Sequence, residues 1–350
     1  MDVGIPETTA DTLRAAFKRA VYFHAVGGHL THNSGCLAEG VLDLGIPVKL
    51  STARVTSRPV SMPFKGIDLM PLVSQPFAGF DGYVVDISHT NQFTPFAGIG
   101  PGGRLAYLNQ SDAASFCRIP DEHLLFTAHE NDFAVQFGRR IPLAFGLSKG
   151  LIAATQTPPP FTGRRRAALR NFRATLNQSL RALLDLTYLP ALARKVPVAG
   201  EVVAPDAYLT SLLNTQVCLA YGGDLYSPIA GNPWFAKNDP ALAAAHSFQE
   251  MKAPAVVLRW DSFRLWESLA AGCLTVHLDF DKYGFALPVK PKAWVHYAPI
   301  DLDNISGSVD ALLAREKEWP AIAAAGRAWA LEHYAPVPTA IRVLSAMLAA

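Results

Sequence analysis

The first fifty residues contain the pattern that most restricts how this chain can fold. Residues 19–26 (RAVYFHAV) are predicted as a buried strand, and Gly27-Gly28 allow a tight turn after it. Residues 34–44 have apolar side chains at helical spacing, and residues 47–52 are predicted as the next strand. A strand, a glycine-rich loop, a helix and a strand in this order predict the start of a parallel α/β sheet.

Two further strands are predicted in the first half, and polar residues follow each of them. Residues 82–87 (GYVVDI) precede Ser-His-Thr-Asn, and residues 123–127 (HLLFT) precede Ala-His-Glu-Asn-Asp. Ligands of open parallel sheets bind beyond the carboxyl ends of the strands. A side chain that acts as general base on a bound ligand would therefore come from these positions. Each polar residue could instead cap a turn. The candidate bases at these two strand ends are Asp86, His89, His129 and Glu130.

The second half begins after a proline-rich connector. Three consecutive prolines in residues 155–166 exclude a helix and a central strand. A long helix is predicted over about 167–187, and residues 207–219 are predicted as a helix that leads into a short strand. Residues 221–253 are predicted as a long loop, and residues 309–349 as two or three amphipathic helices with proline breaks.

Residues 259–277 (RWDSFRLWESLAAGCLTVH) predict a short amphipathic helix, a Gly-Cys corner and an apolar strand. Arg264 and Glu267 are three positions apart, so both emerge on one face of the helix. Asp261 or Ser262 can accept hydrogen bonds from the first-turn amides, and the positive helix end favours an anion. A cation beside a carboxylate that binds hydroxyls suits a sugar nucleotide. A surface ion pair on an ordinary amphipathic helix has the same spacing.

Composition narrows the class of protein. The 350 residues are 50% hydrophobic and 17% charged, which predicts two globular domains with large cores. The net charge of +2 gives no reason to expect a nucleic-acid partner. Four widely spaced cysteines predict buried thiols in a reducing compartment. Without a secretory signal or an 18-residue apolar run, we expect a cytoplasmic protein with no transmembrane segment. Peripheral membrane contact through a partner or a lipid acceptor stays open.

The segment SFRLWESLAAGCLTV (residues 262–276) closely resembles the donor-site signature of exostosin-like glycosyltransferases. Residues 163–184 are similar to the arginine-containing strand and helix that open the second domain of that family. Residues 208–219, followed by Gly222-Gly223, resemble its element just upstream of the signature. The resemblance covers roughly residues 160–340, and only the 262–276 segment is specific.

The resemblance implies an α/β fold with two Rossmann-like domains that face each other across a cleft (GT-B type). The acceptor-side domain would span residues 1–160 and the nucleotide-sugar donor domain residues 161–330, with a C-terminal helix at 331–350 packing back on the first domain. By motif position, Glu267 would hold ribose or sugar hydroxyls, and Arg264 would lie near the diphosphate. The residues implied at the donor are Arg173, Gly222, Gly223, Ser262, Phe263, Arg264 and Glu267.

The predicted function is transfer of a sugar from a nucleotide-diphosphate sugar to a hydroxyl acceptor (a glycan, a lipid or another small molecule), without a cofactor or a metal. Retaining members of the wider fold often carry a second glutamate eight positions before the first. Arg259 stands there, so inversion is favoured over retention. Asp279-Phe280-Asp281 matches the DxD metal site of another glycosyltransferase class, but such triplets recur by chance, and a turn cap is preferred.

Two other functions stay open. The chain could be a non-catalytic nucleotide- or glycan-binding protein on the same scaffold, since these residues do not identify a base. A nicotinamide-dependent oxidoreductase is less favoured. That class needs GxGxxG after a strand, and the glycines that follow residues 19–26 do not have this spacing.

Overall fold

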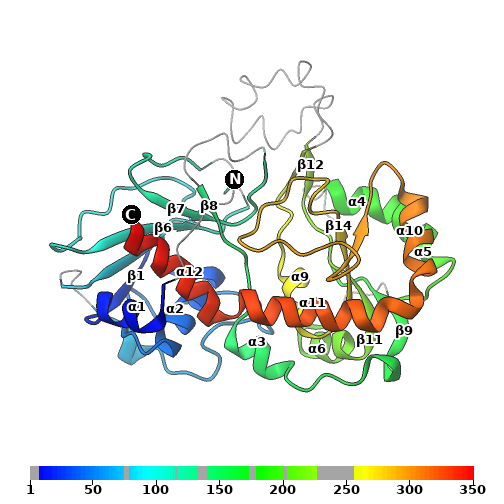
Figure 1. Ribbon diagram of the computed structural model, residues 1–350, viewed down its shortest axis with the longest axis horizontal. Helices are drawn as coiled ribbons and strands as arrows, with labels where there is room; N and C mark the ends of the chain where they lie inside the picture. Colours follow the sequence, from blue (N-terminus) through cyan, green and yellow to red (C-terminus); the bar gives the residue numbers. More distant parts are fainter. Residues whose placement is uncertain are drawn as a thin grey trace, which may run out of the picture.

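The computed structural model describes residues 8–74, 79–112, 114, 117–132, 140–172, 179–199, 203–226 and 256–350. The chain forms two lobes that lie side by side (Figure 1). The first lobe is drawn mainly from the N-terminal half (blue to cyan) and the second mainly from the C-terminal half (green to orange). No helix within the described ranges combines the length and the apolar character needed to cross a membrane.

The first lobe is built on a six-stranded sheet in which all neighbouring strands are parallel. The strand order is β3-β1-β5-β6-β7-β8. The four strands predicted in this half are confirmed, whereas β6 and β8 are not among the predicted ones. The strands are β1 (Val21–Ala25), β3 (Val48–Leu50), β5 (Gly82–Asp86), β6 (Arg104–Asn109), β7 (Leu124–Thr127) and β8 (Arg140–Pro142).

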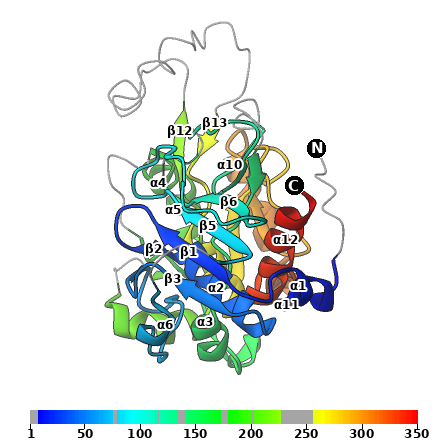
Figure 2. The ribbon, with the colours of Figure 1, turned by 90° about the vertical axis from the view of Figure 1, so that its left-hand side faces the viewer.

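Three helices pack with this sheet, and one of them comes from the other end of the chain. They are α1 (Ala10–Ala16), α2 (His32–Asp43) and α12 (Pro336–Ala349). Figure 2 shows α1 and α12 together on one flank of the sheet. Val41 of α2 and Leu344 of α12 belong to one buried apolar cluster with Val84 of the sheet. A short parallel pair, β2 (Leu30–Thr31) with β4 (Val55–Thr56), and the 3₁₀ helix η1 (Met70–Leu72) complete the lobe.

The second lobe contains a five-stranded parallel sheet in the order β10-β9-β11-β14-β15. Its strands are β9 (Arg165–Leu169), β10 (Val198–Ala199), β11 (Thr215–Leu219), β14 (Leu274–Leu278) and β15 (Ala298–Ile300). An antiparallel pair, β12 (Asp224–Tyr226) with β13 (Val256–Leu258), lies beside it. The helices are α4 (Ser179–Leu186), α5 (Tyr188–Ala193), α6 (Pro205–Leu213), α9 (Phe263–Ala270), α10 (Ile305–Ala314) and α11 (Trp319–Tyr334), with 3₁₀ turns η4 (Phe161–Gly163) and η5 (Glu316–Glu318).

The predicted helix over 167–187 is wrong at its start. Residues 165–169 form β9, which pairs with β10 on one side and β11 on the other. Alanine, leucine and arginine favour helix, but sheet pairing at the centre of a core overrides that preference. The C-terminal helices are confirmed as α10, α11 and α12. The three prolines there, Pro320, Pro336 and Pro338, lie in the first turn of α11 or α12, where no amide hydrogen bond is lost.

The chain passes between the lobes twice, and the two passages touch. The first runs from β8 through α3 (Lys149–Ala154) to β9, and the second joins α11 to α12. The amide of Leu147 donates to the carbonyl of Tyr334, which bonds one passage to the other. Gly146 has a φ of +67°, so the first passage turns there in a conformation that suits glycine.

The strand order of each sheet reverses at one position. Starting from β1, the first sheet grows to β3 on one side and to β5 on the other. The second sheet grows from β9 to β10 on one side and to β11 on the other. A reversal of this kind leaves a crevice beyond the carboxyl ends of the two central strands, where ligands of open α/β sheets bind.

Candidate functional site

A cavity of about 700 Å³ lies at the switch point of the second sheet. Its walls come from both lobes. The first half of the chain contributes Arg58, Pro59, Val60, Gln110, Asp112 and Phe145. The second contributes Asn171, Phe172, Arg181, Val203, Ala204, Tyr208, Gly223, Arg259, Asp261, Ser262, Phe263 and Arg264. Asn171 and Phe172 follow β9, and Gly223 follows β11, so the cavity is where the reversed strand order places a ligand.

Helix α9 begins in this cavity with amides that no side chain caps. Ser262 is the N-cap residue but makes no side-chain cap hydrogen bond. The carboxylate of Asp261 instead accepts from the amide of Phe145 (2.8 Å) and the indole of Trp266 (2.7 Å). Capping by either side chain, as predicted, is therefore wrong. Among the described groups, none accepts from the amides of Phe263 and Arg264, so the positive end of α9 is open to a ligand.

Two arginines add positive charge at this helix end. The guanidinium of Arg264 lies 5.6 Å from the ring centre of Phe172, and that of Arg181 lies 4.9 Å from the same ring. Burial, together with the nearby charges of Arg264 and Arg259, lowers the pKa of Arg181 to about 9. Burial and Arg58 likewise lower the pKa of Arg264. No acidic side chain in the described part forms an ion pair with Arg264, so an anion would relieve this repulsion.

The other end of α9 is closed by arginines. Arg164 donates to the carbonyls of Gly272 and Pro159, and Arg327 donates to those of Ala270 and Thr155. Cations are favourable at the carboxyl end of a helix. Helix α9 is thus satisfied at one end and open at the other.

Glu267, three positions after Arg264, has no access to solvent. Its Oε2 accepts from Arg58 Nη1 (3.2 Å) and from the Tyr208 hydroxyl (2.9 Å), and its Oε1 accepts from the Ser61 hydroxyl. Glu267 is not among the residues that line the cavity. Its carboxylate therefore joins residues 58–61 of the first lobe to the second lobe.

The two predicted glycines lie at the end of β11. Gly223 lines the cavity with a φ of +111°, and a Cβ there would lie 2.4 Å from the carbonyl oxygen of Leu258. Gly222 lies beside Arg181, whose Nη2 would be 3.2 Å from an added Cβ. A side chain at residue 223 would clash with backbone. Arg173 lies outside the described residues.

Arg259 and Asp112 form a further part of the cavity wall. Arg259 has a φ of +56°, which is unusual for a residue with a side chain, and it pairs with Asp224 (2.7 Å) and with Asp112. Asp112 comes from the first lobe, three residues after β6. It is an exposed carboxylate beside a cation, which neither the resemblance nor the predicted strands indicated.

Asp86, one of the four predicted bases, has a structural role in the first lobe. It lies at the end of β5 with no exposure to solvent. One carboxylate oxygen accepts from the Thr31 amide and hydroxyl and from the Ser34 hydroxyl, and the other accepts from Ser88. Asp86 thereby fixes the loop that leads into α2, as the turn-capping alternative predicts.

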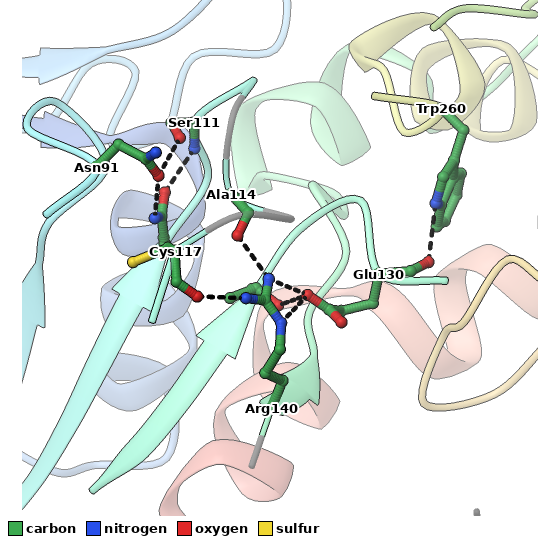
Figure 3. A network of polar contacts seen from close by, with 9 residues as sticks. Asn91, Ser111, Ala114, Cys117, Glu130, Arg140 and Trp260 are labelled. Carbon is green, nitrogen blue, oxygen red and sulfur yellow. Dashed lines mark hydrogen bonds and ion pairs between the residues drawn. The ribbon is translucent and has the colours of Figure 1, made fainter. Parts of the chain in front are cut away.

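Glu130 is bonded within the protein (Figure 3). Its Oε1 accepts from Arg140 Nε (2.8 Å) and from the Thr127 hydroxyl, while the Arg140 guanidinium also donates to the carbonyls of Ala114 and Cys117. The backbone carbonyl of Glu130 accepts from the indole of Trp260 in the second lobe (2.9 Å). Glu130 and Arg140 are each about 1% exposed at the side chain.

His129 is buried at the same contact between the lobes. Its Nδ1 accepts from the amide of Asp261 (3.2 Å), and its φ is +62°. Burial lowers its pKa to about 4.

His89 differs from the other three because it is exposed. Its ring lies 3.5 Å from that of His29, centre to centre. His29 follows β1 and His89 follows β5, so the pair marks the switch point of the first sheet. Burial lowers the pKa of His89, and His29 lowers it further. Within the part of the chain that the structure describes, none of the four predicted bases lines the cavity.

The DxD triplet forms a turn. Asp279 Oδ1 accepts from the amides of Asp281 and Lys282 (3.0 and 3.1 Å), which supports the turn-cap interpretation. Among the described residues, no three His, Cys, Asp or Glu side chains form a group that could hold a metal ion.

The buried histidines make the stability dependent on pH. Burial lowers the pKa of His32, His129 and His277 to about 4, whereas burial raises that of Asp261 to about 7. As pH falls below 6.5, the unfolded chain protonates the histidines before the folded one, which removes stability. Asp261 opposes this, because its folded form binds a proton first. We expect a net loss of roughly 1 to 2 kcal/mol between pH 7 and pH 5.5.

Urea unfolding at the two pH values measures this loss. Buffers of different ionisation heat would show net proton uptake on unfolding at pH 5.5. Equal stability at both pH values, or proton release on unfolding, would contradict the expectation.

Comparisons with known proteins show the fold. No protein-family model and no curated protein sequence matches the chain. Solved structures do. One is an "alpha-glucosyltransferase (AGT) in complex with UDP", with a TM-score of 0.55, 8% identity, and 94% of this chain and 99% of the other covered. Another, "alpha-glucosyltransferase in complex with UDP-glucose and DNA containing an abasic site", has a TM-score of 0.51, 9% identity and the same coverage. AviGT4, "a glycosyltransferase involved in Avilamycin A biosynthesis", has a TM-score of 0.50, 13% identity, and 94% and 97% covered. The chain thus has the predicted two-domain, Rossmann-like GT-B fold.

Proposed function

We propose that this chain is a glycosyltransferase that binds a nucleotide-diphosphate sugar in the cavity between its lobes and transfers the sugar to a hydroxyl group. The observation that carries the proposal is the start of α9. Uncapped amides, Arg264 and Arg181 meet there in one cavity, and burial and the charges of neighbouring arginines lower the pKa of both. A diphosphate supplies the negative charge that this arrangement favours. The UDP and the UDP-glucose bound to structures of similar fold add support.

The same groups would assist the chemistry. Negative charge develops on the leaving nucleoside diphosphate as the glycosidic bond breaks. Fixed arginines and helix amides stabilise such charge without rearranging. Our proposal therefore assigns leaving-group stabilisation to protein cations and amides, with no metal and no cofactor. It keeps the exostosin-like signature at 262–276 as the donor-binding segment, and buried free cysteines fit the proposed cytoplasmic location.

The acceptor side of the reaction needs a base if the sugar inverts. Asp112 is the first-lobe carboxylate that lines the cavity, and we propose it as this base. His89 is the alternative from the predicted set, because it is exposed at the first switch point. The net charge of +2 gives no reason to prefer nucleic acid, so we propose a glycan, a lipid or a small molecule as acceptor.

Calorimetry with sugar nucleotides tests this function. UDP-glucose, UDP and the diphosphates of the other bases would be titrated, and donor hydrolysis would be followed with the ligand that binds best. We expect binding in the micromolar to millimolar range and slow release of sugar. No binding of any nucleoside diphosphate at millimolar concentration would refute the proposal.

A non-catalytic nucleotide-binding protein is the second candidate. The observation in its favour is that none of the four predicted bases lines the cavity. Nucleotide binding without hydrolysis, and without transfer to any of a set of hydroxyl acceptors, would support this candidate over an enzyme.

Arg264→Ala is expected to weaken binding of the nucleoside diphosphate by about 10- to 100-fold. The reason is the loss of a charge-assisted hydrogen bond to phosphate. Arg165→Ala is the matched control, because Arg165 is an exposed arginine on β9 outside the cavity. Titration calorimetry of both variants measures the effect. Equal affinity in the two variants would remove Arg264 from the donor site.

A further inference from the structure

We infer that Arg58 of the first lobe binds the donor diphosphate, and that the buried Glu267 positions Arg58 instead of binding the sugar. This inference rests on the proposed function and adds a ligand from the opposite lobe. It also replaces the role that the family resemblance implies for Glu267.

Arg58 reaches the cavity from the loop after β4. It lines the cavity together with Arg264, and its side chain is 29% exposed. Its Nη1 donates to Glu267, and its guanidinium carbon lies 5.0 Å from the ring centre of Tyr208. One edge of the planar guanidinium is thus held against the second lobe. Because arginine has five N–H donors in a fixed fork, the remaining ones are available to a phosphate.

Glu267 is poorly placed to bind a sugar. Its carboxylate is fully buried and accepts three hydrogen bonds, from Arg58, Tyr208 and Ser61. About three of its four acceptor positions are therefore filled, and because the carboxylate has no access to solvent, a ribose hydroxyl could reach it only by displacing one of these donors. Displacing Arg58 would leave a buried negative charge without its cation, which is costly. The geometry favours Glu267 as a fixed anchor.

The charges in the cavity support a joint role for Arg58 and Arg264. The proximity of Arg58 lowers the pKa of Arg264, so the two cations repel each other across the cavity. The carboxylate of Glu267, which lies outside the cavity lining, offsets part of the positive charge of Arg58. A diphosphate between them would contact Arg58 from the first lobe and the start of α9 from the second. Donor binding would then hold the lobes together at this point.

The test compares UDP with uridine, or the diphosphate and nucleoside of whichever base the calorimetric panel favours. Arg58→Ala is expected to weaken UDP binding at least tenfold and to leave uridine binding unchanged, with weak uridine binding measured by competition. Arg58→Lys should recover part of the loss, because it keeps the charge but not the fork. Unchanged UDP affinity in Arg58→Ala would overturn the inference.

Glu267→Gln separates positioning from sugar binding. If Glu267 positions Arg58, this variant weakens UDP but not uridine, and it has little further effect in an Arg58→Ala background. If Glu267 binds ribose, uridine and UDP weaken together in both backgrounds, which would overturn the inference. Glu332→Gln, which changes an exposed glutamate of α11 outside the cavity, is the control and should bind UDP normally.

Two outcomes keep the test decisive. If Glu267→Gln or Arg58→Ala does not fold, Arg58→Lys decides, since it keeps a cation beside the buried Glu267: weaker UDP binding with unchanged uridine binding supports the inference, and unchanged UDP affinity overturns it. If the unsubstituted protein binds no nucleoside diphosphate, the proposed function fails. Binding that is insensitive to Arg58 leaves that function standing and rejects only the inference.

Discussion

Glu130→Ala is expected to destabilise the protein by about 3 to 5 kcal/mol, because it leaves the buried Arg140 guanidinium without its carboxylate. Both side chains are about 1% exposed, so solvent cannot replace the lost partner. Arg140 also donates to the backbone carbonyls of Ala114 and Cys117, and these bonds depend on its position. Urea unfolding measures the loss.

The matched control is the exposed ion pair between Arg166 and Glu316, whose side chains are 43% and 42% exposed. Glu316→Ala should cost no more than about 1 kcal/mol. The comparison also tests the catalytic alternative for Glu130. A Glu130→Ala protein with normal stability but no transfer activity would show that this residue is a base.

Asp112→Asn is expected to lower kcat for transfer by about 10²- to 10⁴-fold, which is the usual contribution of a general base. The substitution keeps the size of the side chain and removes its basicity. Because Asp112 also pairs with Arg259, donor affinity is measured in parallel and should change only a few-fold. Steady-state kinetics with a saturating donor gives kcat.

Glu122→Gln, which removes an exposed carboxylate of the first lobe outside the cavity, is the control. If Asp112 only positions Arg259, donor affinity and kcat would fall together, and the pH profile would keep its acidic limb. Loss of activity in His89→Gln, with Asp112→Asn active, would transfer the role to His89.

The sequence predicts the α/β fold class and most strands of the first sheet, but it misses individual strands. Strands β1, β3, β5 and β7 are recognisable because each is a short apolar run that ends at polar or turn residues. Strand β6 is easily missed, since only four apolar residues lie between Arg104 and Asn109. Missing it hides the fact that Asp112 follows a strand end. Strand β9 contains good helix formers, so only its neighbours in the sheet decide its conformation.

The candidate site is predictable only where it is local in sequence. Helix α9 follows from residues 262–270, because spacing alone defines a short helix, whereas its open amino end does not, since the sequence predicts a cap at Asp261 or Ser262. Arg58 and Arg181 lie far from that segment, and the fold brings them to it. Nothing near either residue marks it as a ligand. The burial of Glu267 likewise depends on Ser61 and Tyr208, which no helical spacing could reveal.

The arginines at the carboxyl end of α9 also determine where the molecule can bend. Arg164 and Arg327 tie the proline-rich segment at 155–160 to the second lobe, so that segment moves as part of it. Relative rotation of the lobes must therefore occur upstream, where Gly146 lies next to the bonded pair of Leu147 and Tyr334. Two adjacent passages of the chain between the lobes act as a hinge, which permits rotation of the lobes about one axis and resists their twisting or sliding.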